Sequence, residues 1–95
     1  MDVEYATKKL ERTCNSSRLL KKEFGAPAGK AVEKRIVQLR TADCMDDLKY
    51  VTGKWHEMSG DLKGEWAAHL TPNWRIVVVP VGNDAVQVVR IEDYH

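Results

Sequence analysis

The sequence predicts an α+β domain in which two N-terminal helices pack on one face of a small, mainly antiparallel β-sheet. The first half of the chain carries apolar residues at helical spacing, whereas the second half consists of short runs of β-favouring residues separated by turns. Helices followed by a meander of strands are typical of this fold class. The chain has 95 residues, enough for one small domain, which we expect to span residues 1–95.

Two helices are expected in the first half. Apolar residues recur every three to four positions over residues 8–24 and again over residues 28–40, with charged residues between them. Gly25 lies between the two segments and is a common helix terminator, while Pro27 is suited to the first turn of the next helix. We therefore expect two antiparallel helices joined by a tight turn.

Four strands are expected in the second half, each ended by turn residues or by the end of the sequence. They are Lys54–Met58, Glu65–Leu70, Trp74–Val81 and Ala85–Tyr94. The run Trp74–Val81 is apolar on both faces except at Arg75. This pattern predicts a central strand that is buried on both sides.

Composition and missing motifs exclude several classes of function. The chain has 15 Lys and Arg against 14 Asp and Glu, so its net charge of +1 does not by itself indicate nucleic-acid binding. No apolar run is long enough to span a bilayer and no export signal opens the sequence, so we expect a cytoplasmic protein without a membrane partner. No glycine-rich phosphate loop and no metal-ligand spacing is present, so neither a cofactor nor a metal is expected.

Arg75 is the first candidate site residue. A charge inside an apolar strand is costly unless it faces a partner or a cleft. One interpretation is a structural ion pair with Asp61 or Asp93. The other is a guanidinium aimed at an anion, and phosphate fits its planar geometry best.

Histidines on the predicted strands are the second candidate feature. Alternation places Lys54 and His56 on one face, and Asp93 and His95 share a face if the last strand persists. Two imidazoles, an Arg, a Lys and a Tyr on one sheet would suffice for RNA cleavage without a metal. The reaction needs a base, an acid, and a cation or hydrogen-bond donors near the phosphate. Histidine suits the proton transfers because its ordinary pKa lies near working pH.

Basic residues on the predicted helices are a further candidate for RNA contact. Lys34 and Arg35 could bind a phosphate backbone, or they could belong to a solvated helix face. The sequence leaves both interpretations open.

Three segments together carry a family resemblance. The segments His56–Gly64, Trp74-Arg75-Ile76 and the terminal Asp93-Tyr94-His95 resemble those of HigB toxins from bacterial type II toxin–antitoxin systems, in the RelE/ParE superfamily. The resemblance implies a RelE-like fold and a ribosome-dependent endoribonuclease that cuts mRNA in the A site of the 70S ribosome. It also implies inhibition by a HigA-type helix-turn-helix antitoxin. The toxin would contact operator DNA only through this antitoxin.

The resemblance also assigns expected roles to individual residues. Arg75 would hold the scissile phosphate, and His56 and His95 would be the acid and base candidates. Asp93 would orient a neighbour or take part in proton transfer, and Tyr94 would stack on the substrate or position it.

Two positions depart from the family pattern. Ser59 stands where some relatives have Lys, and Leu62 where Arg is common, so two candidate phosphate contacts are missing. Lys54 or Lys63 would have to compensate.

Two other functions remain as alternatives: a ParE-like protein that poisons DNA gyrase without cutting RNA, and a degenerate relative kept as an antitoxin-binding partner. The paired proton-transfer groups favour the nuclease, because a binding protein has no need of them.

Overall fold

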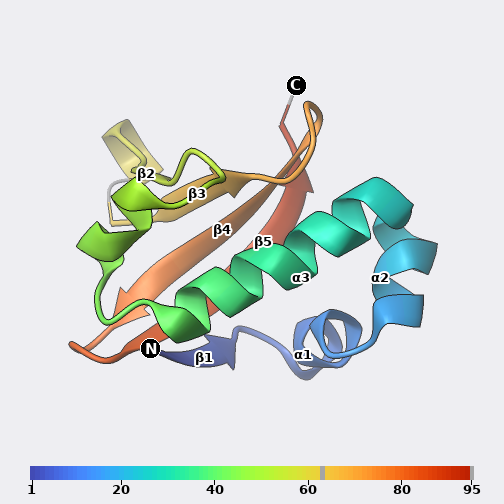
Figure 1. Cartoon of the computed structure of the whole chain (residues 1–95), viewed down its shortest axis with the longest axis horizontal. Coiled ribbons are helices and arrows are strands. Elements are labelled where there is room, and N and C mark those ends of the chain that lie inside the picture. The colour runs from blue at the N-terminus through green and yellow to red at the C-terminus, as the bar shows by residue number, and fades with distance from the viewer. Residues whose placement is uncertain (63, 95) are drawn as a thin grey trace.

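A computed structural model describes residues 1–62 and 64–94 of the chain (Figure 1). In chain order the elements are β1 (Asp2–Tyr5), α1 (Lys8–Cys14), α2 (Ser17–Phe24), α3 (Ala26–Thr41), the 3₁₀ helix η1 (Met45–Tyr50), β2 (His56–Glu57), the 3₁₀ helix η2 (Gly60–Leu62), β3 (Trp66–His69), β4 (Trp74–Val81) and β5 (Ala85–Asp93).

The five strands form one sheet in the order β1-β5-β4-β3-β2. Strand β1 runs parallel to β5, and the other neighbours are antiparallel. Figure 1 shows α3 crossing one face of this sheet, with α1 and α2 beside it. The predicted α+β class, with helices on one face of a mainly antiparallel sheet, is therefore confirmed.

The first strand was not among the predicted elements, and the predicted helix over residues 8–24 is two helices. The break has a local cause. The side chain of Ser16 accepts a hydrogen bond from the backbone N–H of Leu19 at 3.1 Å, which caps the start of α2. Helix α1 is capped by Thr7, whose side-chain oxygen accepts a hydrogen bond from the backbone N–H of Leu10 at 3.0 Å.

The turn between α2 and α3 follows the prediction. Gly25 adopts a φ of 88° and ends α2, and Pro27 lies in the first turn of α3. The two helices then pack closely, because a Cβ built on Gly29 would lie 3.2 Å from the backbone of Leu20. Glycine at position 29 permits this approach.

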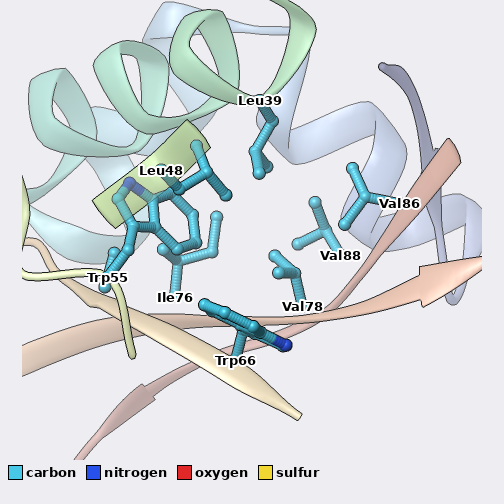
Figure 2. Packing of buried hydrophobic residues seen from close by; sticks show 9 residues of the cluster. Leu39, Leu48, Trp55, Trp66, Ile76, Val78, Val86 and Val88 are labelled. Atoms are coloured by element: carbon cyan, nitrogen blue, oxygen red, sulfur yellow. The ribbon is translucent and has the colours of Figure 1, made fainter. Parts of the chain in front are cut away.

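The main core fills the space between the helical layer and the sheet, as Figure 2 shows. Its labelled members are Leu39, Leu48, Trp55, Trp66, Ile76, Val78, Val86 and Val88. Strand β4 is the middle strand, and Ile76, Val77 and Val78 are all 0% exposed. Since neighbouring residues point to opposite faces, β4 is buried on both sides, as predicted.

The expected strand Lys54–Met58 shortens to the two residues of β2. Gly53 and Lys54 have φ values of 112° and 54°, which are incompatible with an extended strand. Within residues 1–62 and 64–94, no helix is long and apolar enough to cross a membrane.

Candidate active site

Arg75 lies on the face of the sheet that the helices leave uncovered, which we call the site face. Its neighbours in β4 face the helices: Ile76 belongs to the core, and Trp74 contacts Phe24 of α2 edge to face at 5.1 Å. Strand alternation therefore turns Arg75 to the opposite side. Arg75 pairs with His69 on β3 and with Glu92 on β5.

A bulge in β5 determines which of its side chains reach the site face. Val78 pairs with Val88, but Val77 pairs with Arg90, so Val89 is an extra residue. Before the bulge, Val86 and Val88 point into the core. After it, Ile91 takes the inward position, so Arg90, Glu92 and Tyr94 fall on the side of Arg75.

Four charged residues form a chain of ion pairs across the site face. Arg75 donates through Nε to Glu92 at 2.6 Å, and Arg90 donates to the same carboxylate. Arg90 also holds both oxygens of Glu65, at 3.0 and 2.8 Å. The carboxylate that pairs with Arg75 is thus Glu92, a residue that the sequence analysis did not single out.

The ion pairs shift the pKa values of their members. Hydrogen bonds to Glu65 and Glu92 raise the pKa of Arg90, and the bond from Arg90 lowers the pKa of Glu65. Burial alone would raise the pKa of Glu92, but the bonds from Arg90 and Arg75 outweigh it and the net shift is downward. Arg90, Glu65 and Glu92 are therefore charged at neutral pH.

Tyr94 lies beside Arg75. The Arg75 guanidinium carbon is 5.0 Å from the centre of the Tyr94 ring, within the range of a cation–π contact. The Tyr94 hydroxyl is 3.2 Å from Nδ1 of His69, and the two rings meet edge to face at 5.8 Å. His69 was not among the predicted site residues. Its register position opposite Arg75 is the signal that would have found it.

His56 lies on the same face, because it pairs with Ala67, two residues before His69 on β3. Its Nδ1 is 2.9 Å from the carbonyl oxygen of Lys54. A carbonyl only accepts, so Nδ1 carries the hydrogen and, in the neutral ring, Nε2 keeps the lone pair. The side chains of His56 and Lys54 are exposed.

Arg35 has a structural position that does not support the predicted contact with RNA. Its side chain is 8% exposed and donates through Nε to the carbonyl of His69 at 2.9 Å and through Nη1 to the carbonyl of Thr52 at 3.3 Å. Burial lowers its pKa. Arg35 therefore anchors β3 from beneath. Lys34 is exposed on α3, in the helical layer on the other side of the sheet from Arg75.

The remaining predicted residues are placed as follows. Asp93 is exposed and pairs in register with Trp74, on the side that faces the helices, whereas Tyr94 is on the site face. His95 and Lys63 lie outside the described residues. Within residues 1–62 and 64–94, no three His, Cys, Asp or Glu side chains gather in a group that could hold a metal.

Comparison with known proteins identifies a relative of this chain. No family model matches the chain. It is 32% identical over 64 residues to the endoribonuclease HigB of Proteus vulgaris, and the match covers 67% of this chain and 68% of that protein. The chain belongs to the HigB family.

Solved structures confirm the fold of this HigB-family toxin. The YoeB/ParE toxin from Agrobacterium tumefaciens matches with a TM-score of 0.68 at 15% identity, and the match covers 100% of both chains. YoeB in the YoeB–YefM complex from Staphylococcus aureus matches with a TM-score of 0.67 at 12% identity, over 100% of this chain and 97% of that chain. The expected RelE-like fold is therefore present.

Proposed function

We propose that this HigB-family chain is a ribosome-dependent endoribonuclease that cleaves mRNA in the ribosomal A site and so stops translation. The observation that carries the proposal is the placement of Arg75, Tyr94 and His56 on one open face of the sheet. The endoribonuclease name of the Proteus vulgaris relative points to the same chemistry.

Arg75 is the residue that we propose binds the scissile phosphate. A guanidinium has five N–H donors, more than the Glu92 carboxylate uses, so the same side chain can bind a phosphate oxygen. Glu92 is itself held by Arg90, which fixes the direction of the Arg75 fork. A cation held in advance stabilises the extra negative charge of the transition state.

His56 is a proposed proton-transfer group. In the neutral ring its Nε2 can take the proton of the RNA 2′-hydroxyl, whose oxygen then bonds to phosphorus. The bond from phosphorus to the 5′-oxygen breaks, and an acid protonates that oxygen. The products are a 2′,3′-cyclic phosphate and a 5′-hydroxyl, with no metal in the reaction. His95 is the proposed second acid–base group, and either histidine can take either role.

The other predicted residues have supporting roles in the proposal. Tyr94 stacks on or positions the substrate. Asp93 lies on the side of β5 that faces the helices, so its proposed role is to orient a neighbouring group and not to transfer a proton. Lys54 and Lys63 contact the RNA backbone in place of the cations missing at Ser59 and Leu62.

A HigA-type helix-turn-helix antitoxin is the proposed inhibitory partner. The related fold of YoeB is known in complex with YefM, which supports a protein partner of this kind. The proposed toxin contacts operator DNA only through that antitoxin.

Primer extension on a defined transcript, with and without ribosomes, tests the proposed function. We expect cleavage by the wild type only with ribosomes, and a fall of about 10²-fold or more for Arg75→Ala and for His56→Ala. A transcript with a 2′-deoxynucleotide at the cleavage site should stay intact, because the nucleophile is missing. Asn83→Ala, in the exposed β4–β5 turn, is the matched control.

Thermal melting of each variant separates loss of chemistry from loss of folding. Full cleavage by both Arg75→Ala and His56→Ala would show that the assigned site is wrong. Intact transcripts together with blocked DNA replication in expressing cells would instead support the gyrase-poisoning alternative.

A further inference from the structure

We infer that His69 is a positioning residue for the proposed cleavage reaction, which acts by holding the Tyr94 ring beside Arg75. The inference rests on the proposed function and adds to it a residue outside the predicted site. Two contacts support it: the 3.2 Å separation between the Tyr94 hydroxyl and Nδ1 of His69, and the edge-to-face contact of the two rings.

The backbone of His69 is fixed on both sides, so its imidazole is a rigid support. The N–H of His69 donates to the carbonyl of Gly53 at 2.8 Å, and its carbonyl accepts from Nε of the buried Arg35 at 2.9 Å. The backbone N–H of Tyr94 also donates to the carbonyl of Asn73 at 3.1 Å. The two rings therefore meet from two anchored points of the sheet, which favours one orientation of Tyr94.

The surroundings of His69 favour a neutral imidazole. Basic side chains face it from several elements: Lys54 and His56 from β2 and the residues before it, Arg35 from α3, and Arg75 from its register position on β4. Burial and the charges of Lys54, His56 and Arg35 lower the pKa of His69, so the ring is neutral at physiological pH. We assign the neutral ring the tautomer with hydrogen on Nε2, in which Nδ1 accepts the hydroxyl proton of Tyr94.

This geometry gives the Tyr94 ring a defined position next to Arg75, the proposed phosphate-binding residue. The hydroxyl is tied to His69 at one end of the ring, while the ring itself lies 5.0 Å from the Arg75 guanidinium carbon. Without the acceptor at position 69, the Tyr94 side chain gains rotational freedom beside the phosphate, and a poorly placed group costs rate.

Three substitutions at position 69 distinguish this role from simple packing. His69→Ala should lower the cleavage rate about tenfold, the worth of one hydrogen bond. In His69→Asn the amide oxygen can lie near the position of Nδ1, so this variant should recover much of the rate. In His69→Gln the amide lies near the position of Nε2, and this variant should stay slow. Equal rates for Asn and Gln, or a wild-type rate for Ala, would overturn the inference.

A double-mutant cycle with Tyr94→Phe tests whether His69 acts through the hydroxyl. Tyr94→Phe alone should slow cleavage, and adding His69→Ala to it should slow the reaction no further. Additive losses, or a wild-type rate for Tyr94→Phe, would contradict the inference. Asn83→Ala serves again as the control that leaves the rate unchanged.

Nitrogen-15 NMR of the imidazole supplies a readout that does not depend on cleavage. We expect the Nε2–H tautomer of His69 in the wild type, and a rise in the pKa of His69 in Tyr94→Phe, because the neutral ring loses a donor. A wild-type spectrum with hydrogen on Nδ1, or a pKa unaffected by Tyr94→Phe, would overturn the inference. If the wild type cleaves no RNA while both NMR expectations hold, the proposed function fails and the His69–Tyr94 contact stands.

Discussion

The guanidinium of Arg35 joins three segments beneath the candidate site: α3, the loop at Thr52–Gly53 and the end of β3. Gly53 lies against it so closely that an added Cβ would be 2.7 Å from the Arg35 Cζ atom. The hydrogen bonds of Arg35 prevent the guanidinium from moving aside. Gly53 also has a φ of 112°, which other residues rarely adopt.

Gly53→Ala should therefore destabilise the protein by about 2–4 kcal/mol, since backbone strain and overpacking add together. Urea denaturation measures the change. Gly82→Ala is the matched control, because Gly82 also has a positive φ, 63°, but an added Cβ would meet nothing within 4 Å. We expect about 1 kcal/mol for Gly82→Ala. Equal losses at the two positions would show that the contact with Arg35 costs nothing.

Individual site residues were predictable where strand alternation or the terminal motif identified them. Arg75 stood out because it interrupts an apolar run, and Tyr94 because of the family resemblance. Burial of Arg35 could not be read from the sequence, because its bonds to Thr52 and His69 depend on tertiary contacts far along the chain. His69 was missed for the same reason, since its partner is 25 residues away.

Because of the bulge at Val89, β5 supplies side chains both to the core and to the site face. Val86 and Val88 supply the core, and after the bulge Arg90, Glu92 and Tyr94 supply the site face. If Val89 were instead paired in regular alternation, without a bulge, these three polar residues would turn toward the helices.

Deletion of Val89 should destabilise the protein by less than about 2 kcal/mol, because Val88 can still pair with Val78 and Arg90 with Val77, so the side chains of β5 keep their faces. Val89→Ala is the control: it keeps the bulge and removes only part of a half-buried side chain, so we expect a loss below about 1.5 kcal/mol. Circular dichroism during urea unfolding compares the two variants. A much larger loss for the deletion than for Val89→Ala would contradict these strand pairings.

Among the elements, β4 and β5 were predicted well because long apolar runs with clear turns mark them. The bulge was not predicted, since Val88-Val89 reads as ordinary strand sequence. Strand β1 was also missed, because four residues at the start of the chain carry little pattern until β5 is there to pair with them. The break before α2 was overlooked although Ser16 is a common capping residue.

The molecule as a whole should lose stability in two steps as the pH falls. The pKa of His69 is lowered in the folded state, so below about pH 6.5 the unfolded chain binds that proton more strongly and folding weakens. The pKa values of Glu65 and Glu92 are also lowered, so their contribution is present above about pH 4.5 and is lost as the pH falls further.

Urea unfolding at a series of pH values measures both steps. We expect the lower step to shrink in Glu65→Gln, because one of the two carboxylates with a lowered pKa is then absent. His69→Asn should remove the upper step and leave the lower one. A stability that does not change between pH 7 and pH 4 would contradict the structural origin of these pKa shifts.

The parallel pairing of β1 with β5 has a consequence for how the toxin is made. Asp2 aligns with Ala85, so β1, which is synthesised before the other strands, has no pairing partner until β5, the last of the five, has been synthesised. Arg75 likewise has no Glu92 or Tyr94 beside it until that same strand emerges. A nascent chain that has not reached residue 85 therefore has neither the β5 strand that joins β1 to β4 nor the residues that complete the site face.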